Sequence, residues 1–211
     1  MHQSAFAFAE TYLTNLEGNM PCMYPDIKGL VTTSIGVLLP LDDALRLKWR
    51  KKLAPIMLAS QEEIRREWNR MDGNMVVADY KNRRKYEFAE LVLAAEDLDN
   101  LFNRKLVQFD GIIRSRFANY DKLNADQQLL ITCGIAWGVG PWFRWPKFIK
   151  SVGEQDFPTM YRECYTTQFT AERNAANRVL VNNSAVVAAR GLDPSILYYP
   201  RDLKKEPVNA S

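Results

Sequence analysis

Two acids and a hydroxyl lie close together near the N-terminus of the chain and have the types needed for acid–base chemistry. Glu17 comes first, and Asp26 and Thr32 follow on either side of a glycine. A carboxyl group that protonates a leaving oxygen, facing a carboxylate and a hydroxyl, suits cleavage of a glycosidic bond. One carboxyl group would protonate the leaving oxygen, and the other, with the hydroxyl, would hold a water or stabilise positive charge.

A helix end and a β-hairpin are the elements that must position these side chains. Residues 4–17 carry apolar side chains at spacings of three and four, which predicts an amphipathic helix. Gly18 suits the left-handed position that follows a helix C-terminus. Residues 20–39 contain strand-forming residues beyond Gly29, so we expect a hairpin that turns at this glycine.

The position of the turn predicts which side chains of the hairpin share a face. Residues equidistant from the centre of a turn lie opposite each other in an antiparallel pair. With Gly29 at the centre, Asp26 lies opposite Thr32, and Tyr24 lies opposite Ser34. Because side chains alternate along a strand, all four would line one face. We therefore expect Tyr24 and Ser34 to bind substrate.

The same segment resembles the catalytic opening of the phage-type lysozymes, glycoside hydrolase family 24. In that family a Glu-Gly at the end of the first helix is followed by Tyr-x-Asp, a Gly turn, a Thr and a Gly-x-Gly. The Glu, Asp and Thr form the catalytic triad. The matching residues, with no gap needed, are Glu17, Gly18, Tyr24, Asp26, Gly29, Thr32 and Gly36. Two positions depart: Ser34 stands where the family usually has the first Gly, and Val37 where it usually has a His.

The resemblance implies an α+β, mostly α, lysozyme-like fold. A small N-terminal β-hairpin lobe and a helical C-terminal lobe would be joined by a long helix. The expected parts are a single domain at 1–199, with a hairpin catalytic lobe at 20–39, a helical insertion at 54–92 and a helical lobe at 94–192, and then a loose tail at 200–211.

Capping signals and apolar spacing predict the individual helices. Ser60-x-x-Glu63 is a capping box that opens one helix. Asp42 or Asp43 can cap another, which we expect to run on to Leu53. The other helices are expected at 94–113, 127–137, 147–153, 158–166 and 172–190, and Asn124 or Asp121 can cap the second of these.

The resemblance also implies an arginine on the last helix. The corresponding helix of the family places an arginine beside the catalytic Glu, and the aligned position here is Ala175. Arg173 or Arg178 would have to substitute for it. Both are therefore candidate substrate-binding residues.

Composition and charge exclude several other classes of function. The 211 residues carry a formal net charge of only +3, which fits mild attraction to an anionic cell wall rather than a nucleic-acid partner. His2 is the sole histidine, and the three cysteines are widely spaced. A zinc site, a Ser-His-Asp triad and a disulfide framework are therefore not expected, and no metal or organic cofactor is implied.

The reaction implied by the resemblance is that of a peptidoglycan muramidase. Such a lysozyme hydrolyses the β-1,4 bond between N-acetylmuramic acid and N-acetylglucosamine, with inversion of configuration. It would serve as a phage endolysin or as a secreted antibacterial effector. A chitinase and a lytic transglycosylase remain open, as does a catalytically idle module that binds peptidoglycan or builds a phage or secretion particle.

The expected partners and location follow from this reaction. Peptidoglycan glycan strands are the substrate, an inhibitor or immunity protein stays open, and we expect a monomer without nucleic-acid binding or membrane insertion. The apolar runs are too short to span a membrane, and residues 1–10 lack the features of a signal peptide. The chain is therefore expected to be made in the cytoplasm and to act in the periplasm or cell wall after holin-type release or specialised secretion.

Overall fold

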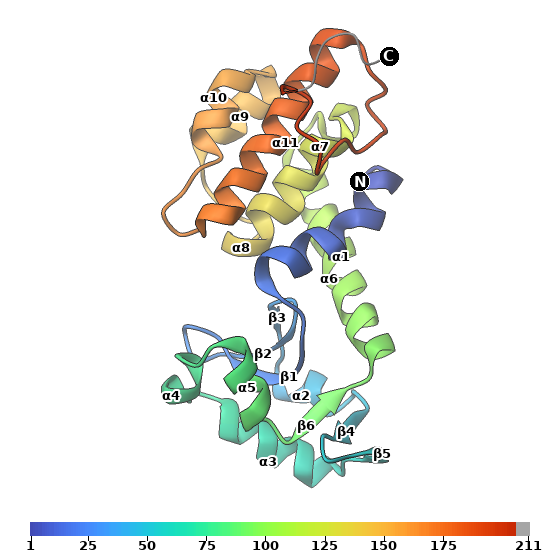
Figure 1. Cartoon of the computed structure of the whole chain (residues 1–211), viewed down its shortest axis with the longest axis vertical. Helices are drawn as coiled ribbons and strands as arrows, with labels where there is room; N and C mark the ends of the chain where they lie inside the picture. Colours follow the sequence, from blue (N-terminus) through green and yellow to red (C-terminus); the bar gives the residue numbers. More distant parts are fainter. Residues whose placement is uncertain (206–211) are drawn as a thin grey trace. The chain divides into compact units, whose positions relative to one another are not determined.

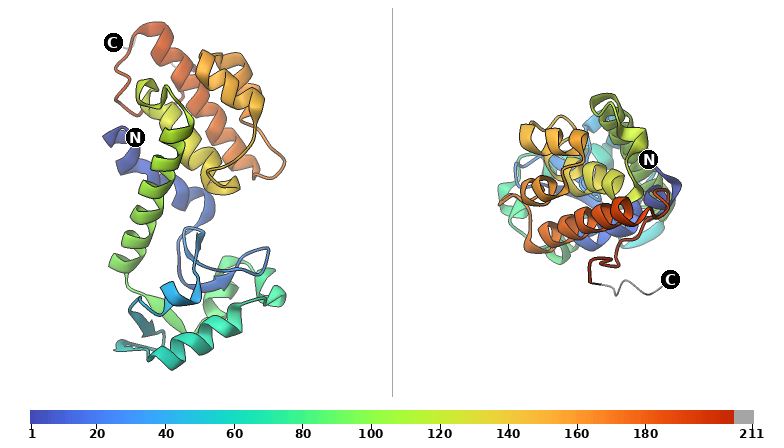
Figure 2. Two further views of the ribbon diagram at one scale, coloured as in Figure 1. Left: turned by 180° about the vertical axis from the view of Figure 1, so that it is seen from behind. Right: turned by 90° about the horizontal axis from the view of Figure 1, so that it is seen from above.

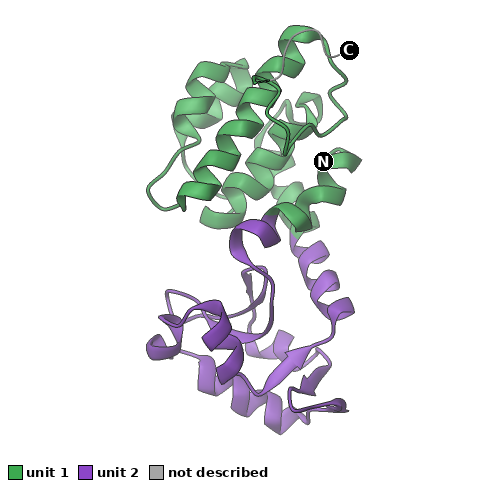
Figure 3. Cartoon of the chain, in the orientation of Figure 1, with its two compact units in different colours: residues 1–12, 106–211 green, residues 13–105 purple. Residues whose placement is uncertain are grey.

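The computed structural model describes residues 1–205 and shows an α+β fold that is mostly helical (Figure 1). Helices contain 57% of the residues and strands 11%, and the strands form two small antiparallel sheets. Residues 13–105 make one compact unit, and residues 1–12 with 106–211 make the other (Figure 3). Helices α1 (Gln3–Glu17) and α6 (Ala95–Arg116) contribute to both units, so the single domain of residues 1–199 stays a prediction.

A three-stranded antiparallel sheet follows helix α1 in the unit of residues 13–105. Its strands are β1 (Met20–Pro25), β2 (Val31–Ser34) and β3 (Val37–Leu38), in the order β1-β2-β3. A hairpin is thus present within residues 20–39, as predicted, and β3 extends it. Met23, Val31 and Leu39 are buried in the core that this sheet shares with the rest of the unit.

The register of the hairpin differs from the prediction. Thr32 pairs with Tyr24, and the backbone amide of Asp26 donates to the carbonyl of Leu30. Asp26 therefore does not lie opposite Thr32 but diagonally from it, as a next neighbour. The reason is local: the turn is centred one residue before Gly29 because the Asp26 side chain itself closes it.

A second antiparallel sheet lies in the same unit. In the order β5-β4-β6, its strands are β5 (Ala54–Leu58), β4 (Trp49–Lys51) and β6 (Leu91–Leu93), and the short helix α2 (Leu41–Ala44) precedes them. The helix predicted to run from Asp42 or Asp43 to Leu53 is therefore wrong. Trp49 is fully buried and pairs with Leu93, so a pairing with a distant strand overrides the local helical spacing.

Residues 54–92 contain three helices between strands of the second sheet. These are α3 (Gln61–Met71), α4 (Met75–Ala78) and α5 (Asn82–Phe88), and all three contact β1. The capping box of Ser60 and Glu63 opens α3 as predicted. Strand β5 at the start and β6 at the end were not predicted. That this segment is an insertion relative to the lysozymes stays a prediction.

The other unit is helical. Beyond α6 it contains a 3-10 turn (Tyr120–Lys122), α7 (Ala125–Leu129), a π-helical segment (Leu130–Ala136), α8 (Trp137–Val139), α9 (Pro146–Glu154), α10 (Phe157–Glu163) and α11 (Ala171–Arg190). Asn124 caps α7, one of the two caps considered, and residues 125–137 are all buried. Helix α11 packs against α7, the π-helical segment and α10 (Figure 2).

A close helix contact in this unit depends on Gly134. The fully buried Asn177 accepts from the Tyr12 hydroxyl at 3.0 Å and donates to the Gly134 carbonyl at 3.4 Å. A Cβ at Gly134 would collide with the Asn177 side chain, whereas a Cβ at Gly153 in α9 meets no atom within 4 Å. We expect Gly134→Ala to lower the free energy of unfolding by about 2 to 3 kcal/mol.

The matched control is Gly153→Ala, which should leave stability unchanged or raise it by up to about 1 kcal/mol, because alanine favours a helix over glycine. Urea denaturation followed by circular dichroism measures both variants. Equal unfolding free energies for the two variants would show that the Asn177 contact tolerates a methyl group.

The C-terminal segment is anchored up to the end of the described chain. Leu203 is buried, and its amide donates to the Asn183 side chain at 2.9 Å. The Asn183 amide group donates in turn to the carbonyl of Arg201 at 2.9 Å. The prediction of a loose tail is therefore wrong for residues 200–205, and residues 206–211 lie outside the described residues.

Candidate active site

Glu17 ends helix α1 at an exposed position. The following residue, Gly18, has a positive φ of 77°, and its amide donates to the carbonyl of Thr14 at 2.9 Å. This conformation favours glycine and ends the helix where the sequence predicted. The carboxyl group is thus presented by a helix terminus and is accessible to solvent.

Asp26 has a structural role in the turn between β1 and β2. Its Oδ1 accepts from the backbone amides of Lys28 at 2.8 Å and Leu30 at 2.9 Å. Within residues 1–205 the structure shows no hydrogen bond to Oδ2, and the side chain is half-buried. One carboxylate oxygen therefore closes the turn, and the other remains for a water molecule.

Thr32 and Ser34 lie on β2 with buried hydroxyl groups. The Thr32 hydroxyl donates to the Leu30 carbonyl at 3.0 Å, which leaves its oxygen able to accept from water. Ser34 pairs with Met20 rather than with Tyr24, contrary to the prediction, because the register is irregular between these residues of β1. Its hydroxyl is buried and has no hydrogen-bond partner among the described residues.

The pKa of Tyr24 is affected by both Glu17 and Asp26. Burial raises the pKa of its hydroxyl well above the usual range, and the negative charge of Glu17 raises the pKa further. Asp26 adds a smaller rise, and a hydrogen bond from the backbone of Gly36 acts in the opposite sense. The phenol therefore stays protonated and lies in the electrostatic field of both carboxylates.

Two lysines complete this site and were not assigned from the sequence; Lys85 is buried and Lys105 half-buried. Lys105 on α6 donates to the carbonyl of Gly36 at 2.5 Å. Burial lowers its pKa to about 8, and the charge of Glu17 partly offsets that shift. Each carboxylate of the site is therefore matched by a lysine, because Lys85 on α5 plays the same part for Asp26.

Lys85 is buried, which is unusual for a lysine. Its ammonium donates to the carbonyl of Pro25 at 3.2 Å and lies 5.1 Å from the centre of the Tyr24 ring. Burial lowers its pKa, and the charge of Asp26 acts against this shift. The apolar spacing around Tyr86 and Phe88 does not distinguish the buried lysine from its exposed neighbours, so the sequence gives no signal for it.

The lowered pKa of Lys105 predicts a pH dependence of stability. Between a folded-state pKa of about 8 and the usual value of 10.5, the unfolded chain binds more protons than the folded chain. The unfolding free energy of the wild type should therefore rise over this range relative to Lys105→Met, by on the order of 2 kcal/mol. Urea denaturation at several pH values measures it. Lys48→Met, at an exposed position, is the control and should run parallel to the wild type.

If the unfolding free energies of the wild type and Lys105→Met change with pH in parallel, the lowered pKa of Lys105 is refuted. The comparison between variants matters because the buried cysteines and tyrosines titrate in both proteins at alkaline pH and cancel in the difference.

Arg173 and Arg178 belong to the helical unit. Arg173 is buried, donates to the Cys133 carbonyl at 3.1 Å and lies 4.9 Å from the Phe169 ring centre. Arg178 lies over the rings of two tyrosines, 5.1 Å from each centre. Arg173 thus packs inside its own unit, and contact of either arginine with substrate stays a prediction.

Neither a metal cluster nor a membrane-spanning helix is found in the described part of the chain. Across residues 1–205, His, Cys, Asp and Glu side chains do not gather in threes that could hold a metal ion. Over the same residues, the helices are too short or too polar to cross a membrane.

Comparison of the chain with models of protein families, with curated proteins and with solved structures gives no match. The resemblance to the phage-type lysozymes therefore rests on the residues between Glu17 and Gly36. The structure adds that both carboxylates raise the pKa of Tyr24 and that a lysine lies in the electrostatic field of each, Lys105 for Glu17 and Lys85 for Asp26.

Proposed function

We propose that the chain is a peptidoglycan muramidase with a lysozyme-like fold. The observation that carries the proposal is that Glu17 ends α1 while Asp26 and Thr32 lie on the hairpin that follows it, with Tyr24 in the electrostatic field of both carboxylates. Two carboxyl groups supplied by different elements are what acid-catalysed cleavage of a glycosidic bond requires. The mildly basic chain fits an anionic wall polymer.

In this proposal the two acids have different tasks because their surroundings differ. Glu17 is exposed at a helix end and protonates the leaving oxygen. Asp26 is held rigidly by two backbone amides, and its second oxygen orients water or stabilises the oxocarbenium ion. Thr32 accepts a hydrogen bond from that water.

The backbone between β2 and β3 supports the resemblance to lysozymes. The family has Gly-x-Gly where this chain has Ser34 and Gly36. Ser34 has φ of 52° and Gly36 has φ of 66°, and both values lie in the left-handed region that favours glycine. A serine in this conformation is strained, and the shared conformation explains why glycine would be usual at both positions.

A catalytically idle module that binds peptidoglycan is the second candidate. The role of Asp26 Oδ1 in the turn favours it, because this carboxylate would be retained for structure alone. A chitinase and a lytic transglycosylase are alternatives within the enzymes. The products separate them: a muramidase releases reducing ends of N-acetylmuramic acid, and a transglycosylase releases anhydro ends.

The test is incubation of the purified protein with purified peptidoglycan, followed by measurement of reducing ends and mass spectrometry of the fragments. The proposal expects hydrolysed muramic acid ends. Binding to peptidoglycan without new ends would establish the idle module, and cleavage of chitin alone would establish a chitinase.

The place of action is part of the proposal. The substrate lies outside the inner membrane, so expression in the cytoplasm should be tolerated, whereas fusion to a secretion signal should cause rounding and lysis of the cells. Equal toxicity in both compartments would point to a target other than peptidoglycan. Delivery by a holin or by a specialised secretion system would meet this requirement in the natural setting.

A further inference from the structure

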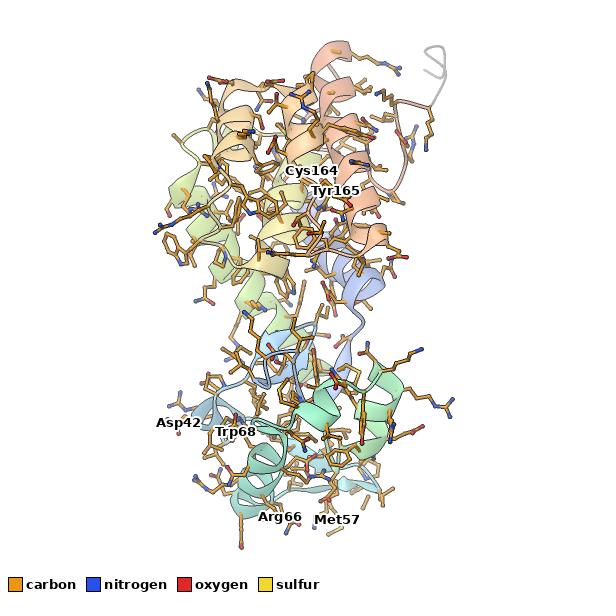
Figure 4. The ribbon with its side chains drawn as sticks, turned by 90° about the vertical axis from the view of Figure 1, so that its left-hand side faces the viewer. Asp42, Met57, Arg66, Trp68, Cys164 and Tyr165 are labelled. Carbon is orange, nitrogen blue, oxygen red and sulfur yellow. The ribbon has the colours of Figure 1, made fainter. Side chains whose placement is uncertain are left out.

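The hairpin of strands β4 and β5 carries apolar side chains that the described chain leaves uncovered. Leu53 is 95% exposed and Ile56 is 91% exposed. Met57 and Leu58 are more than half exposed, and Met57 lies at the outer edge of its unit (Figure 4). Scattered single residues of this kind are ordinary, but four of them on one short hairpin make a contiguous patch that indicates a binding surface.

The same segment is strongly basic. Residues 46–58 contain five basic side chains and no acidic one. Two of the five are used in ion pairs, Lys51 with Glu63 at 2.7 Å and Arg46 with Asp43 at 3.7 Å. Glu87 and Glu90 are paired with arginines outside the segment, at 2.9 Å and 3.5 Å. Lys48, Arg50 and Lys52 are therefore the basic side chains of the segment without a carboxylate partner in residues 1–205. The exposed ammonium of Lys48 has no such partner within residues 1–205 and is left to attract an external anion.

A hollow of about 500 Å³ lies beside the hairpin. Lys52 and Leu53 line one side, and Arg66 and Phe88 belong to the other. Arg66, labelled in Figure 4, extends from α3 near the same outer edge as Met57. Glu63, Glu87 and Glu90 line the hollow as well, so the hollow is close to neutral and the attraction for an anion comes from the basic side chains of the hairpin itself.

Addition of a partner strand to this sheet is disfavoured by Pro55. Strand β5 lies at the edge of the sheet, where a partner strand would need its backbone donors. Pro55 has no N–H, and its carbonyl already accepts from the Arg50 side chain at 3.1 Å. Proline and a bulge are devices that protect an edge from pairing, and the register of β4 with β5 is irregular here.

We propose that the β4–β5 hairpin docks on the surface of an anionic phospholipid bilayer. The side chains of Leu53, Ile56 and Met57 enter the interface, while the basic residues of the segment 46–52 bind the headgroups. Combined apolar and basic groups are what a protein needs to lie on such a membrane without spanning it. The surface is separate from the candidate active site and goes beyond the proposed hydrolase activity.

The test is sedimentation of the full chain with sucrose-loaded vesicles made of phosphatidylglycerol and phosphatidylcholine, or of phosphatidylcholine alone. The wild type should bind the anionic vesicles and not the neutral ones, and added salt should weaken binding. The double variant Leu53→Asp, Ile56→Asp should bind at least about tenfold more weakly. Lys48→Glu should bind roughly thirtyfold more weakly, because it removes one positive charge and adds one negative charge, each at about 1 kcal/mol at the surface.

Val76→Asp is the matched control, since Val76 is an exposed valine of the same unit on α4. It should bind within about twofold of the wild type, as a surface substitution outside the patch does. The proposal is overturned if Val76→Asp weakens binding as much as the double variant, or if the wild type binds neutral and anionic vesicles equally. A concentration-dependent dimer that the double variant abolishes would assign the patch to a second copy of the chain instead. None of these assays contains peptidoglycan, so their outcome is independent of the proposed function.

Discussion

Replacement of Glu17 by Gln should abolish the release of reducing ends from peptidoglycan while leaving the fold intact. The amide has the size of the carboxyl group but cannot donate a proton to the leaving oxygen. General acid catalysis contributes roughly a hundredfold to ten-thousandfold, so we expect activity to fall by about a thousandfold. The measurement is the initial rate of reducing-end formation under saturating substrate.

The free energy of unfolding of Glu17→Gln shows whether a loss of activity comes from the missing acid or from unfolding. Glu17 is exposed at the end of α1 but its charge favours the charged form of Lys105, so the free energy of unfolding should fall by about 1 kcal/mol at most. Glu62→Gln is the matched control, because Glu62 is an exposed glutamate of the same unit and lies in the first turn of α3. Wild-type activity in Glu17→Gln would refute the acid assignment, whatever the behaviour of the control.

Local signals in the sequence located the ends of the elements well. Gly18 stops α1, Ser60 and Glu63 cap α3, and Asn124 caps α7. Each signal depends on backbone atoms within three or four residues, so it can be interpreted without knowledge of the rest of the chain.

Pairings between distant segments could not be derived in the same way. Strand β4 was predicted as helix because its apolar spacing fits both periods, and only the contact of Trp49 with Leu93 decides between them. The register of the hairpin failed for a different reason. The side chain of Asp26 moves the centre of the turn by one residue. Glycine fits both possible turns, so the position of Gly29 alone does not determine which one forms.

In the candidate site, too, local features could be predicted from the sequence and contacts between distant segments could not. The acids, Tyr24 and Thr32 were found because residue type and spacing are local information. The two lysines were missed because burial is a property of the folded unit: Lys105 is placed by α6 against Gly36, and Lys85 is placed by α5 against Pro25. A lysine in a sequence is exposed in most proteins, so its type alone argues against the position that the structure gives it.

Two substitutions distinguish a catalytic role of the Asp26 charge from the role of its side chain in closing the turn. In Asp26→Asn the amide oxygen can still accept from the amides of Lys28 and Leu30, so the turn is retained while the charge is lost. In Asp26→Ala both hydrogen bonds are lost as well. If the charge acts in catalysis, both variants should lose activity about a hundredfold or more, because the oxocarbenium ion and the water lose the same carboxylate.

Their stabilities should differ although their activities do not. Asp26→Asn leaves the buried Lys85 without its opposing charge, which should lower the free energy of unfolding by about 1 kcal/mol. Asp26→Ala should lose about 1 kcal/mol more, the net contribution of hydrogen bonds at a solvated turn. Asp42→Asn, at an exposed position of α2, controls for the change of charge. Should Asp26→Asn keep full activity while Asp26→Ala loses both activity and stability, Asp26 serves only the turn, and the idle module that binds peptidoglycan becomes the better description of this protein.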